Sequence, residues 1–272
     1  MKPFEGKKGL IIGVANDRSI AWAIAKEIME QGGVCGFTHL PDRADDERQR
    51  NRRRVSQLTD DYKDNAKFLV PLDVQNDENI QGVMKTTEAH FGKIDFLLHS
   101  VAFADRKDLD NDTIETGREG FKLAMDISAY SLLAVSKFAR PILNSGASIC
   151  AMTYFGGEKI VPGYNVMGIC KAALEACVRY LAYDLGPSAV RVNAISAGPL
   201  RTLAGSAAGV DEMLKLYEYM APLARNVTHQ EVGRSGAFLL SPLSDGITGE
   251  ILHVDGGYNA MGSPGRLLDR LK

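Results

Sequence analysis

The sequence predicts an α/β protein with one doubly wound parallel sheet of about seven strands, flanked by helices on both faces. Short β-branched apolar runs alternate with helical patterns along the whole chain. Several runs, such as GLIIGVA at 9–15 and FLLHSVAF at 96–103, are continuously apolar, which is typical of strands covered on both faces. No repeat, low-complexity linker or shift in composition divides the chain. We therefore expect residues 1–272 to form a single domain of the Rossmann type.

Seven strands and five crossover helices follow from these patterns. The strands are expected at 9–15, 34–40, 67–74, 94–102, 147–153, 190–197 and 250–255. The helices are expected at 19–31, 77–91, 118–143, 164–185 and 230–240. Each helix is long enough to connect two parallel strands by a right-handed crossover.

The composition limits the kind of protein that this can be. With 272 residues, of which 45% are hydrophobic and 24% charged, the chain can bury a core without disulfides or a structural metal. Its net charge of -2 argues against general binding of nucleic acid, and no run approaches the ~20 apolar residues of a membrane span. The short apolar run near the N-terminus is broken by Gly13 and lacks a signal-peptide pattern. We expect a cytoplasmic protein with no nucleic-acid or membrane partner.

The cysteines and histidines do not form a metal-binding pattern. The four cysteines show no C-x-x-C spacing and lie in apolar segments, at Cys35, Cys150, Cys170 and Cys177. The five histidines are scattered singly. We expect buried thiols in a reducing compartment and no metal site.

The segment at 42–54, DRADDERQRNRRR, invites a nucleic-acid hypothesis because it contains six arginines. It also contains four acids, with opposite charges three or four residues apart, as in Asp46 and Arg50. No aromatic residue lies among the arginines to stack on bases. A solvated helix face is the favoured interpretation.

The first strand and helix have the geometry of a dinucleotide site. The strand ends in Gly13, a short loop follows, and a helix begins near Ser19 and Ile20, so backbone N–H groups can face a pyrophosphate. The Ser19 hydroxyl can bond either the helix backbone or a phosphate oxygen. The glycine pattern alone is weak, since only one glycine of the usual motif is present. An ordinary strand–turn–helix junction remains the alternative.

The ends of the next three strands bear on the rest of this site. The second strand ends near Leu40, where no acid stands at the tip to select NAD, and Asp42 or Arg43 could act either way. Asp73, with Val74 beside it, can accept a hydrogen bond from the adenine amino group, or can be an ordinary turn residue. Ser100 and Val101 are small residues at the edge of a central strand, where a cofactor can approach closely.

Tyr154, Tyr164 and Lys171 form the candidate catalytic group. If a helix begins near Tyr164, Lys171 lies seven residues later, about two turns at 3.6 residues each, and faces the same side. Tyr154 ends the preceding strand, so all three side chains can reach one crevice at the carboxyl edge of the sheet. A Tyr-x3-Lys pair would mark a carbonyl-reducing dehydrogenase, but the position four before Lys171 is Met167. Packing tyrosines are the alternative interpretation.

Long ordered segments resemble one family over nearly the whole chain. They are GVANDRSIAW, LDV, HSVAFA, REGFKLAMDISAYSLLAVSK, TYFGGEKIVPGYNVMGICKAALEACVRYLA, RVNAISAGPLRTLA and GEILHVDGGY. With these the chain resembles a bacterial enoyl-[acyl-carrier-protein] reductase of the NADH-dependent, short-chain dehydrogenase type. The resemblance implies that NADH is the favoured cofactor, with NADPH possible, that the substrate is an enoyl thioester on acyl carrier protein, and that the protein is a homotetramer.

The resemblance also implies roles for individual residues. Tyr154 and Tyr164 are the active-site tyrosines and border the acyl substrate, as does Ala104, while Lys171 binds the cofactor. The residues implied to line the dinucleotide are Gly13, Ser19, Ile20, Leu40, Asp73, Val74, Ser100, Val101, Leu200, Arg201, Thr202, Leu203 and Ala204.

The displaced tyrosine suits an enoyl substrate. A carbonyl reductase protonates the oxygen on the carbon that receives the hydride, whereas an enoyl thioester develops charge on the more distant thioester oxygen. A donor moved by about one helical turn, from the slot of Met167 to Tyr164, fits that enolate oxygen. The role of Tyr154 is less defined.

The segment at 199–222 is rich in Ala, Gly and Leu, and we expect it to form a substrate-binding lid; a surface helix pair is the alternative. It carries Asp211 and Glu212 where relatives often place basic residues for the acidic carrier, so Arg201 or Arg225 would have to serve instead. Two other functions stay open: a carbonyl or β-ketoacyl reductase, and a non-catalytic dinucleotide sensor.

Overall fold

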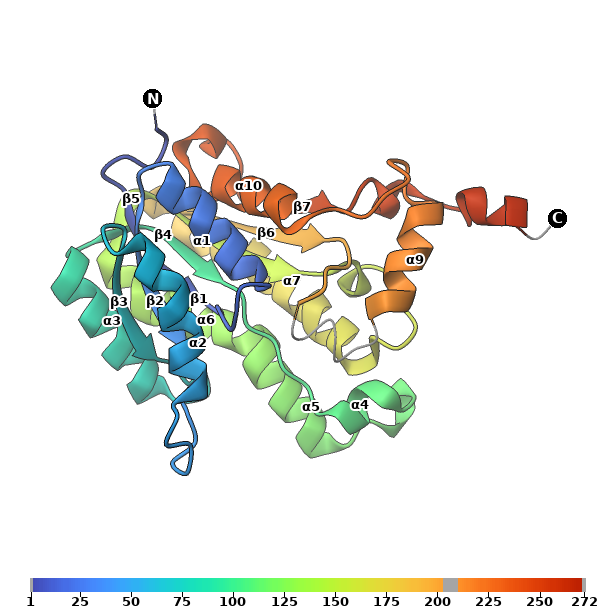
Figure 1. The fold of residues 1–272 in the computed structure, drawn as a ribbon, viewed down its shortest axis with the longest axis horizontal. Coiled ribbons are helices and arrows are strands. Elements are labelled where there is room, and N and C mark those ends of the chain that lie inside the picture. Colours follow the sequence, from blue (N-terminus) through green and yellow to red (C-terminus); the bar gives the residue numbers. More distant parts are fainter. Residues whose placement is uncertain (1, 203–209, 271–272) are drawn as a thin grey trace.

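The computed structural model describes residues 2–202 and 210–270. All seven strands lie in one parallel sheet, in the order β3-β2-β1-β4-β5-β6-β7 (Figure 1). The strands are β1 (Lys8–Ile12), β2 (Val34–His39), β3 (Ala66–Pro71), β4 (Ile94–His99), β5 (Leu143–Thr153), β6 (Arg191–Ala197) and β7 (Ile251–Val254). The predicted doubly wound parallel sheet is therefore confirmed.

Helices cover both faces of the sheet, and each face has its own apolar core. One core joins the sheet to α1 (Ile20–Glu30), α2 (Arg50–Thr59) and α10 (His229–Leu240), through residues such as Ile24, Val55 and Leu239. The other joins it to α3 (Asp77–Phe91), α6 (Ser131–Ala139) and α7 (Asn165–Leu185). Helices α1 and α10 lie side by side (Figure 1). Burial on both faces explains why several strands are apolar along their whole length.

The strand order reverses between β1 and β4, because the chain leaves β1 toward β2 on one side and later enters β4 on the other. In sheets of this topology the connecting loops part at such a point and leave a crevice at the carboxyl ends of the strands. Three further helices surround this edge: α4 (Arg106–Asp110), α5 (Arg118–Met125) and α9 (Val210–Met220). The fold thus directs attention to the residues that follow β1 and β4.

The long helix predicted at 118–143 is not continuous. Helix α5 passes into a π-helical turn at Asp126–Tyr130, α6 follows, and a 3-10 turn at Arg140–Ile142 leads into β5. Pro141 has no backbone N–H to continue the α-helical ladder, which accounts for the stop. Consequently β5 begins at Leu143 and not at 147 as predicted.

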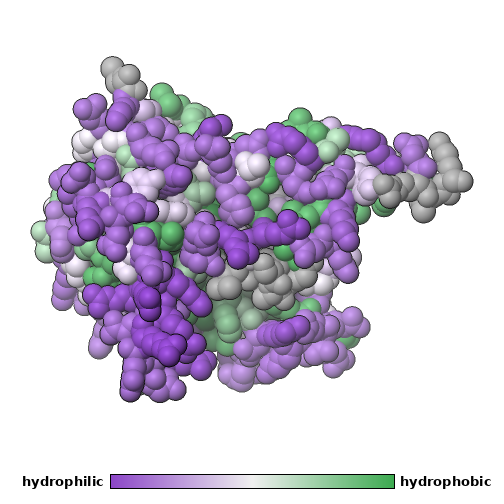
Figure 2. All heavy atoms as spheres, viewed as in Figure 1, coloured by the Kyte–Doolittle hydropathy of each residue, from purple (hydrophilic) through white to green (hydrophobic). Residues whose placement is uncertain are grey.

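The charged segment at 42–54 is exposed and mostly non-helical. Helix α2 begins only at Arg50, and Val55 is its one buried residue. Asp46 forms an ion pair with Arg50 at 3.0 Å, which lowers the pKa of the Asp46 carboxyl. Figure 2 shows strongly hydrophilic atoms over this part of the surface, at the lower left. The predicted solvated helix face is therefore wrong for 42–49, where no helix forms, although most of the segment is exposed to solvent.

None of the helices in residues 2–202 and 210–270 has the length and apolar character that a membrane crossing requires. Within the same residues, no group of three or more His, Cys, Asp or Glu side chains is arranged to hold a metal ion. Cys35, Cys150 and Cys170 are buried, Cys177 is half-buried, and all four are free thiols.

Candidate active site

The carboxyl edge of the sheet gathers the residues that the sequence singled out. Each strand from β1 to β6 is followed, within a few residues of its end, by at least one candidate site residue. In strand order across the sheet they are Asp73 and Val74 after β3, Leu40 after β2, Gly13 after β1, Ser100 and Val101 after β4, Tyr154 after β5, and Leu200 after β6. This arrangement brings together side chains that are far apart in the sequence.

Gly13 lies where the ends of β1 and β4 pack closely together. Its φ of +102° lies in the region that favours glycine, and a Cβ there would collide with the carbonyl group of Ser100. The Ser100 N–H donates to the Ile12 carbonyl oxygen at 3.1 Å, so the ends of β1 and β4 are held together. The absence of a side chain at Gly13 thus allows the ends of β1 and β4 to pack closely at the edge where ligands of such sheets bind.

Ser19 stabilises the loop that connects Gly13 to helix α1. It occupies the N-cap position of α1, but its hydroxyl does not bond the helix. Instead it accepts hydrogen bonds from the N–H groups of Ala15 at 2.9 Å and Asn16 at 3.0 Å. Because the hydroxyl turns back into the loop, the first turn of α1, beginning at Ile20, keeps backbone N–H groups for an anion.

Asp42, one of the two candidates for contact with the adenosine ribose, is bonded to the protein backbone. Its carboxylate accepts the N–H groups of Asn51 at 2.6 Å and Arg52 at 3.2 Å, so it stabilises the start of α2. Leu40, at the end of β2, is 69% exposed, and Arg43 is exposed beside it. Of the two candidates for the ribose, Asp42 is therefore committed to the fold, whereas Arg43 projects into solvent.

Asp73 lies two residues beyond β3. One carboxylate oxygen accepts the N–H of Gln75 at 3.0 Å, and the Asp73 N–H donates to Asn79 at 2.7 Å. The side chain is exposed, and Val74 beside it is buried in the core. This loop is thus rigid enough to present the second carboxylate oxygen at the edge of the sheet.

Tyr154 and Tyr164 meet directly. Their ring centroids are 4.8 Å apart with planes at 67°, an edge-to-face arrangement. Gly156 makes the approach possible, since a Cβ there would collide with the Tyr164 ring. Burial raises the pKa of both phenols, most strongly at Tyr164, so both stay protonated and can donate at neutral pH.

Lys171 lies beneath this pair on α7. It is 5% exposed, and its Nζ donates to the Met152 carbonyl oxygen at 2.8 Å, two residues before Tyr154. Burial lowers the pKa of Lys171 to about 8, against the opposing effects of Cys170 and Glu175. Met167, in the slot where a carbonyl reductase carries tyrosine, is buried and packs with Val166 and Cys170.

Glu175 is a functional neighbour that the sequence reasoning missed. Its buried carboxylate accepts a hydrogen bond from Thr153 Oγ1 at 2.7 Å, which ties the end of β5 to α7. This contact fixes the strand that carries Tyr154 against the helix that carries Lys171. The spacing of Glu175, four residues after Lys171 on one helix, is the signal that could have indicated it.

The pKa of Lys171 leads to a pH prediction. Below about pH 8 the ammonium is charged and can hold a cofactor hydroxyl by a charge-assisted hydrogen bond; above it that charge is lost. We expect the dissociation constant of NADH to rise about tenfold between pH 7 and pH 9.5, measured by nicotinamide fluorescence. In Lys171→Met the affinity should be weak at both pH values. An affinity of the unaltered protein that does not change with pH would contradict this role.

A second cluster holds the segment after β4. His99 is fully buried, its Nε2 lies 2.8 Å from Ser131 Oγ, and burial lowers its pKa to about 3, so it is neutral. Ser128, in the π-helical turn, accepts from the Phe103 N–H at 2.9 Å and donates to the Phe103 carbonyl at 3.0 Å. Ala104 follows and packs with Tyr164 against the small core around Val166. The π-helical turn thus holds the segment that packs Ala104 against the same small core as Tyr164.

The segment after β6 is only partly described. Leu200 is buried, Thr202 follows, and Leu203 and Ala204 lie outside the described residues. Arg201 pairs with Asp211 at 2.9 Å. Arg225, the other cation considered for carrier docking, pairs with Glu231 at 2.6 Å. Both cations are thus engaged with acids of this chain.

A doubly wound parallel sheet with a dinucleotide crevice beside two tyrosines and a lysine defines a nicotinamide-dependent oxidoreductase of the short-chain dehydrogenase class. A family profile described as enoyl-(acyl carrier protein) reductase matches residues 13–259, and the chain belongs to that family.

Curated relatives and solved structures agree with this assignment. The chain is 49% identical to the enoyl-[acyl-carrier-protein] reductase [NADH] FabI of Nostoc sp., over 94% of this chain and 98% of the relative. The Bacillus cereus reductase solved with NADP+ and indole naphthyridinone has a TM-score of 0.91 and 43% identity, covering 97% of this chain and 100% of that one. The Anaplasma phagocytophilum reductase solved with NAD has a TM-score of 0.89 and 42% identity, covering 97% and 95%.

Proposed function

We propose that this protein reduces the trans-2 double bond of enoyl thioesters on acyl carrier protein, with NADH as the hydride donor, in the last step of fatty-acid elongation. The observation that carries the proposal is the edge-to-face pair of Tyr154 and Tyr164 beside Lys171, with Met167 buried in the usual tyrosine slot. Membership of the enoyl reductase family supports the same reaction.

The residues of the crevice fit a nicotinamide dinucleotide. The glycine turn at Gly13, the N-terminus of α1 and the Asp73 carboxylate suit the pyrophosphate and the adenine, and the Lys171 ammonium suits a ribose hydroxyl. Ser100, Val101, Leu200, Arg201 and Thr202 are proposed to line the remainder. When bound, NADH supplies the hydride that adds to the β carbon of the substrate.

Tyr164 is proposed to act on the thioester oxygen. Charge develops there as the β carbon is reduced, and a protonated phenol donating to that oxygen stabilises the enolate. The raised pKa of Tyr164 keeps its proton available across the neutral range. Lys171 adds positive potential and orients the cofactor, while Tyr154 and Ala104 border the acyl chain.

A rate assay tests this function. The disappearance of reduced nicotinamide is followed by its near-ultraviolet absorbance, with a crotonyl thioester against NADH and NADPH in separate runs. We expect consumption with the enoyl substrate and the faster rate with NADH. A control with a β-ketoacyl thioester should be slow. Turnover of the β-ketoacyl thioester alone would indicate a carbonyl reductase, and cofactor binding without any turnover would indicate a sensor.

We further propose that the chain works as one domain in which 199–222 forms the substrate-binding lid. That all seven strands share one sheet supports the single domain, and α9 supports the lid because it buries Tyr217 next to Tyr154. Limited proteolysis with and without cofactor tests this. Protection of 199–222 by NADH and an acyl thioester is expected, and equal cleavage would contradict it.

The quaternary state and location are also proposals. The outer faces of α5 to α7 expose large apolar side chains, namely Phe121, Tyr130, Ile169, Tyr180 and Tyr183, which support a homotetramer assembled through these helices. A cytoplasmic location is supported by the acyl-carrier-protein substrate of the family. Light scattering of the purified protein measures the assembly, and a monomeric mass would refute the tetramer.

A further inference from the structure

Helix α9 contributes a third tyrosine to the neighbourhood of the active-site pair. Along this helix Val210, Leu214 and Tyr217 are buried, at spacings of four and three residues, so they form one face. Tyr217 is 1% exposed and is the largest fully buried side chain described. The helix therefore inserts a phenol into the interior of the protein next to the crevice.

A chain of aromatic contacts links Tyr217 to the site. Its ring stacks on Tyr258, with centroids 3.9 Å apart and planes at 12°. Tyr258 in turn meets Phe155 edge-to-face at 5.7 Å, and Phe155 directly follows Tyr154. The Asp255 carboxylate holds the Tyr258 turn, since it accepts the N–H groups of Gly257 at 2.9 Å and Asn259 at 2.8 Å. The position of the Tyr217 ring is thus set by its stack on Tyr258, which is itself held by Phe155 and Asp255.

The hydroxyl of Tyr217, in contrast, has no hydrogen-bond partner in residues 2–202 and 210–270, although it is fully buried. Burial raises the pKa of Tyr217 most, and the Tyr154 phenol raises it further, whereas the Tyr217 hydroxyl lowers the pKa of Tyr154. The two hydroxyls are therefore near enough for Tyr217 to act as a hydrogen-bond donor toward Tyr154. A buried hydroxyl without a partner destabilises the fold relative to phenylalanine. A hydroxyl retained at such a cost, and so close to Tyr154, indicates a role in function.

We propose that Tyr217 is a positioning residue for the reductase reaction: its hydroxyl donates a hydrogen bond to the Tyr154 phenol when the site is occupied, and thereby orients Tyr154 toward the acyl thioester. Helix α9 then couples its own position to the tyrosine pair, because Tyr154 contacts Tyr164. The proposal rests on the proposed function, since it assigns a role within the same site.

Tyr217→Phe tests the proposal because it removes only the hydroxyl and keeps the ring that stacks on Tyr258. We expect kcat for the crotonyl thioester to fall about 3- to 10-fold, with the KM for NADH unchanged. The melting temperature should stay the same or rise, since an unpartnered buried hydroxyl is removed. A merely structural role predicts the opposite pattern, a lower melting temperature. Tyr62→Phe, which removes a phenolic hydroxyl that bonds Glu30 outside the site, is the matched control and should leave kcat unchanged.

A double-mutant cycle shows whether Tyr217 acts through Tyr154. In a Tyr154→Phe background, adding Tyr217→Phe should change kcat less than twofold, because the acceptor is already absent. Losses that multiply, a kcat of Tyr217→Phe equal to that of the unaltered protein, or a parallel loss of melting temperature and activity would each overturn the proposal. If the unaltered protein itself fails to reduce the enoyl thioester, the proposed function is what fails.

Discussion

Replacing Tyr164 by phenylalanine is expected to lower kcat for a crotonyl thioester by about 10²-fold or more, the usual contribution of a positioned acid in the transition state. The substitution removes only the phenolic hydroxyl, so the edge-to-face contact with Tyr154 is kept. Because the hydroxyl is proposed to act on the substrate oxygen, the affinity for NADH should change little. Steady-state rates measured from nicotinamide absorbance, with NADH binding measured separately, check both expectations.

The matched control for Tyr164 is Tyr62, whose hydroxyl donates to Glu30 at 3.3 Å far from the crevice. Tyr62→Phe removes the same atom and should leave kcat unchanged. Tyr154→Phe should have a smaller effect than Tyr164→Phe, since Tyr154 is proposed to border the acyl chain and not to act on the thioester oxygen. An unchanged kcat in Tyr164→Phe would refute the assignment of the proton donor.

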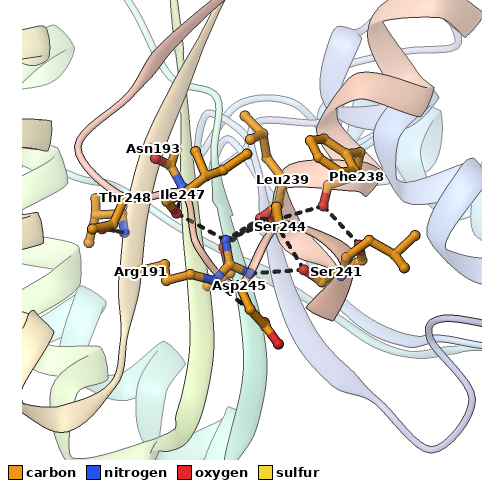
Figure 3. A network of polar contacts seen from close by, with 12 residues as sticks. Arg191, Asn193, Phe238, Leu239, Ser241, Ser244, Asp245, Ile247 and Thr248 are labelled. Carbon is orange, nitrogen blue, oxygen red and sulfur yellow. Dashed lines mark hydrogen bonds and ion pairs between the residues drawn. The ribbon is translucent and has the colours of Figure 1, made fainter.

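Replacing Arg191 by methionine is expected to cause the largest loss of stability, about 2–4 kcal/mol. Its buried guanidinium lies at the C-terminus of α10 and donates to the carbonyl oxygens of Leu239 at 3.0 Å and Ser241 at 2.9 Å, and to Ser244 Oγ at 2.8 Å (Figure 3). Methionine fills a similar volume but removes all of these charge-assisted hydrogen bonds, so that the carbonyl oxygens of Leu239 and Ser241 keep only serine hydroxyls as side-chain donors. It also removes a positive charge from the negative end of the helix dipole. Denaturant unfolding measures the loss.

Arg234 supplies the comparison for this measurement. Arg234 lies on α10, the helix whose C-terminal carbonyl groups Arg191 binds. Its side chain is 62% exposed, and its Nε is 3.7 Å from the Glu27 carboxylate. Arg234→Met should change the free energy of unfolding by less than about 1 kcal/mol, as is usual for an exposed ion pair. Arg191→Lys should give an intermediate loss, because an ammonium cannot reproduce the planar fork of donors. Equal losses for Arg191→Met and Arg234→Met would contradict the network in Figure 3.

Part of the candidate site could be predicted because it is encoded locally. The spacing of Tyr164 and Lys171 along one helix, and the position of Gly13 between a strand and a helix, follow from backbone geometry alone. The position of Met167, four residues before Lys171, is likewise set by spacing along one helix. Contacts between distant segments carry no such periodic signal. The spacing from Lys171 could indicate Glu175 itself, but its bond to Thr153 and the Tyr217–Tyr258 stack could not be predicted from the sequence.

The sequence likewise could not assign the charged residues that follow β2. Asp42 and Arg43 were equivalent candidates for the ribose in the sequence, and only the folded chain commits the Asp42 carboxylate to the N-terminus of α2. The prediction of a helix at 118–143 was also wrong at its C-terminal end. Pro141 interrupts the helical hydrogen bonds there, and β5 begins four residues before the predicted start at 147. The first outcome depends on a hydrogen-bond partner nine residues away, and the second on the change from helix to strand after Pro141.

The sequence by itself determined the doubly wound sheet, the edge at which the site forms and the displacement of the tyrosine from the slot of Met167. These depend on periodicity and on short spacings, which the backbone converts directly into position. The tertiary structure alone decided that Tyr154 meets Tyr164, that Glu175 ties β5 to α7, and that Tyr217 reaches the site from α9. Such contacts depend on packing between elements, and packing is settled only when the whole core closes.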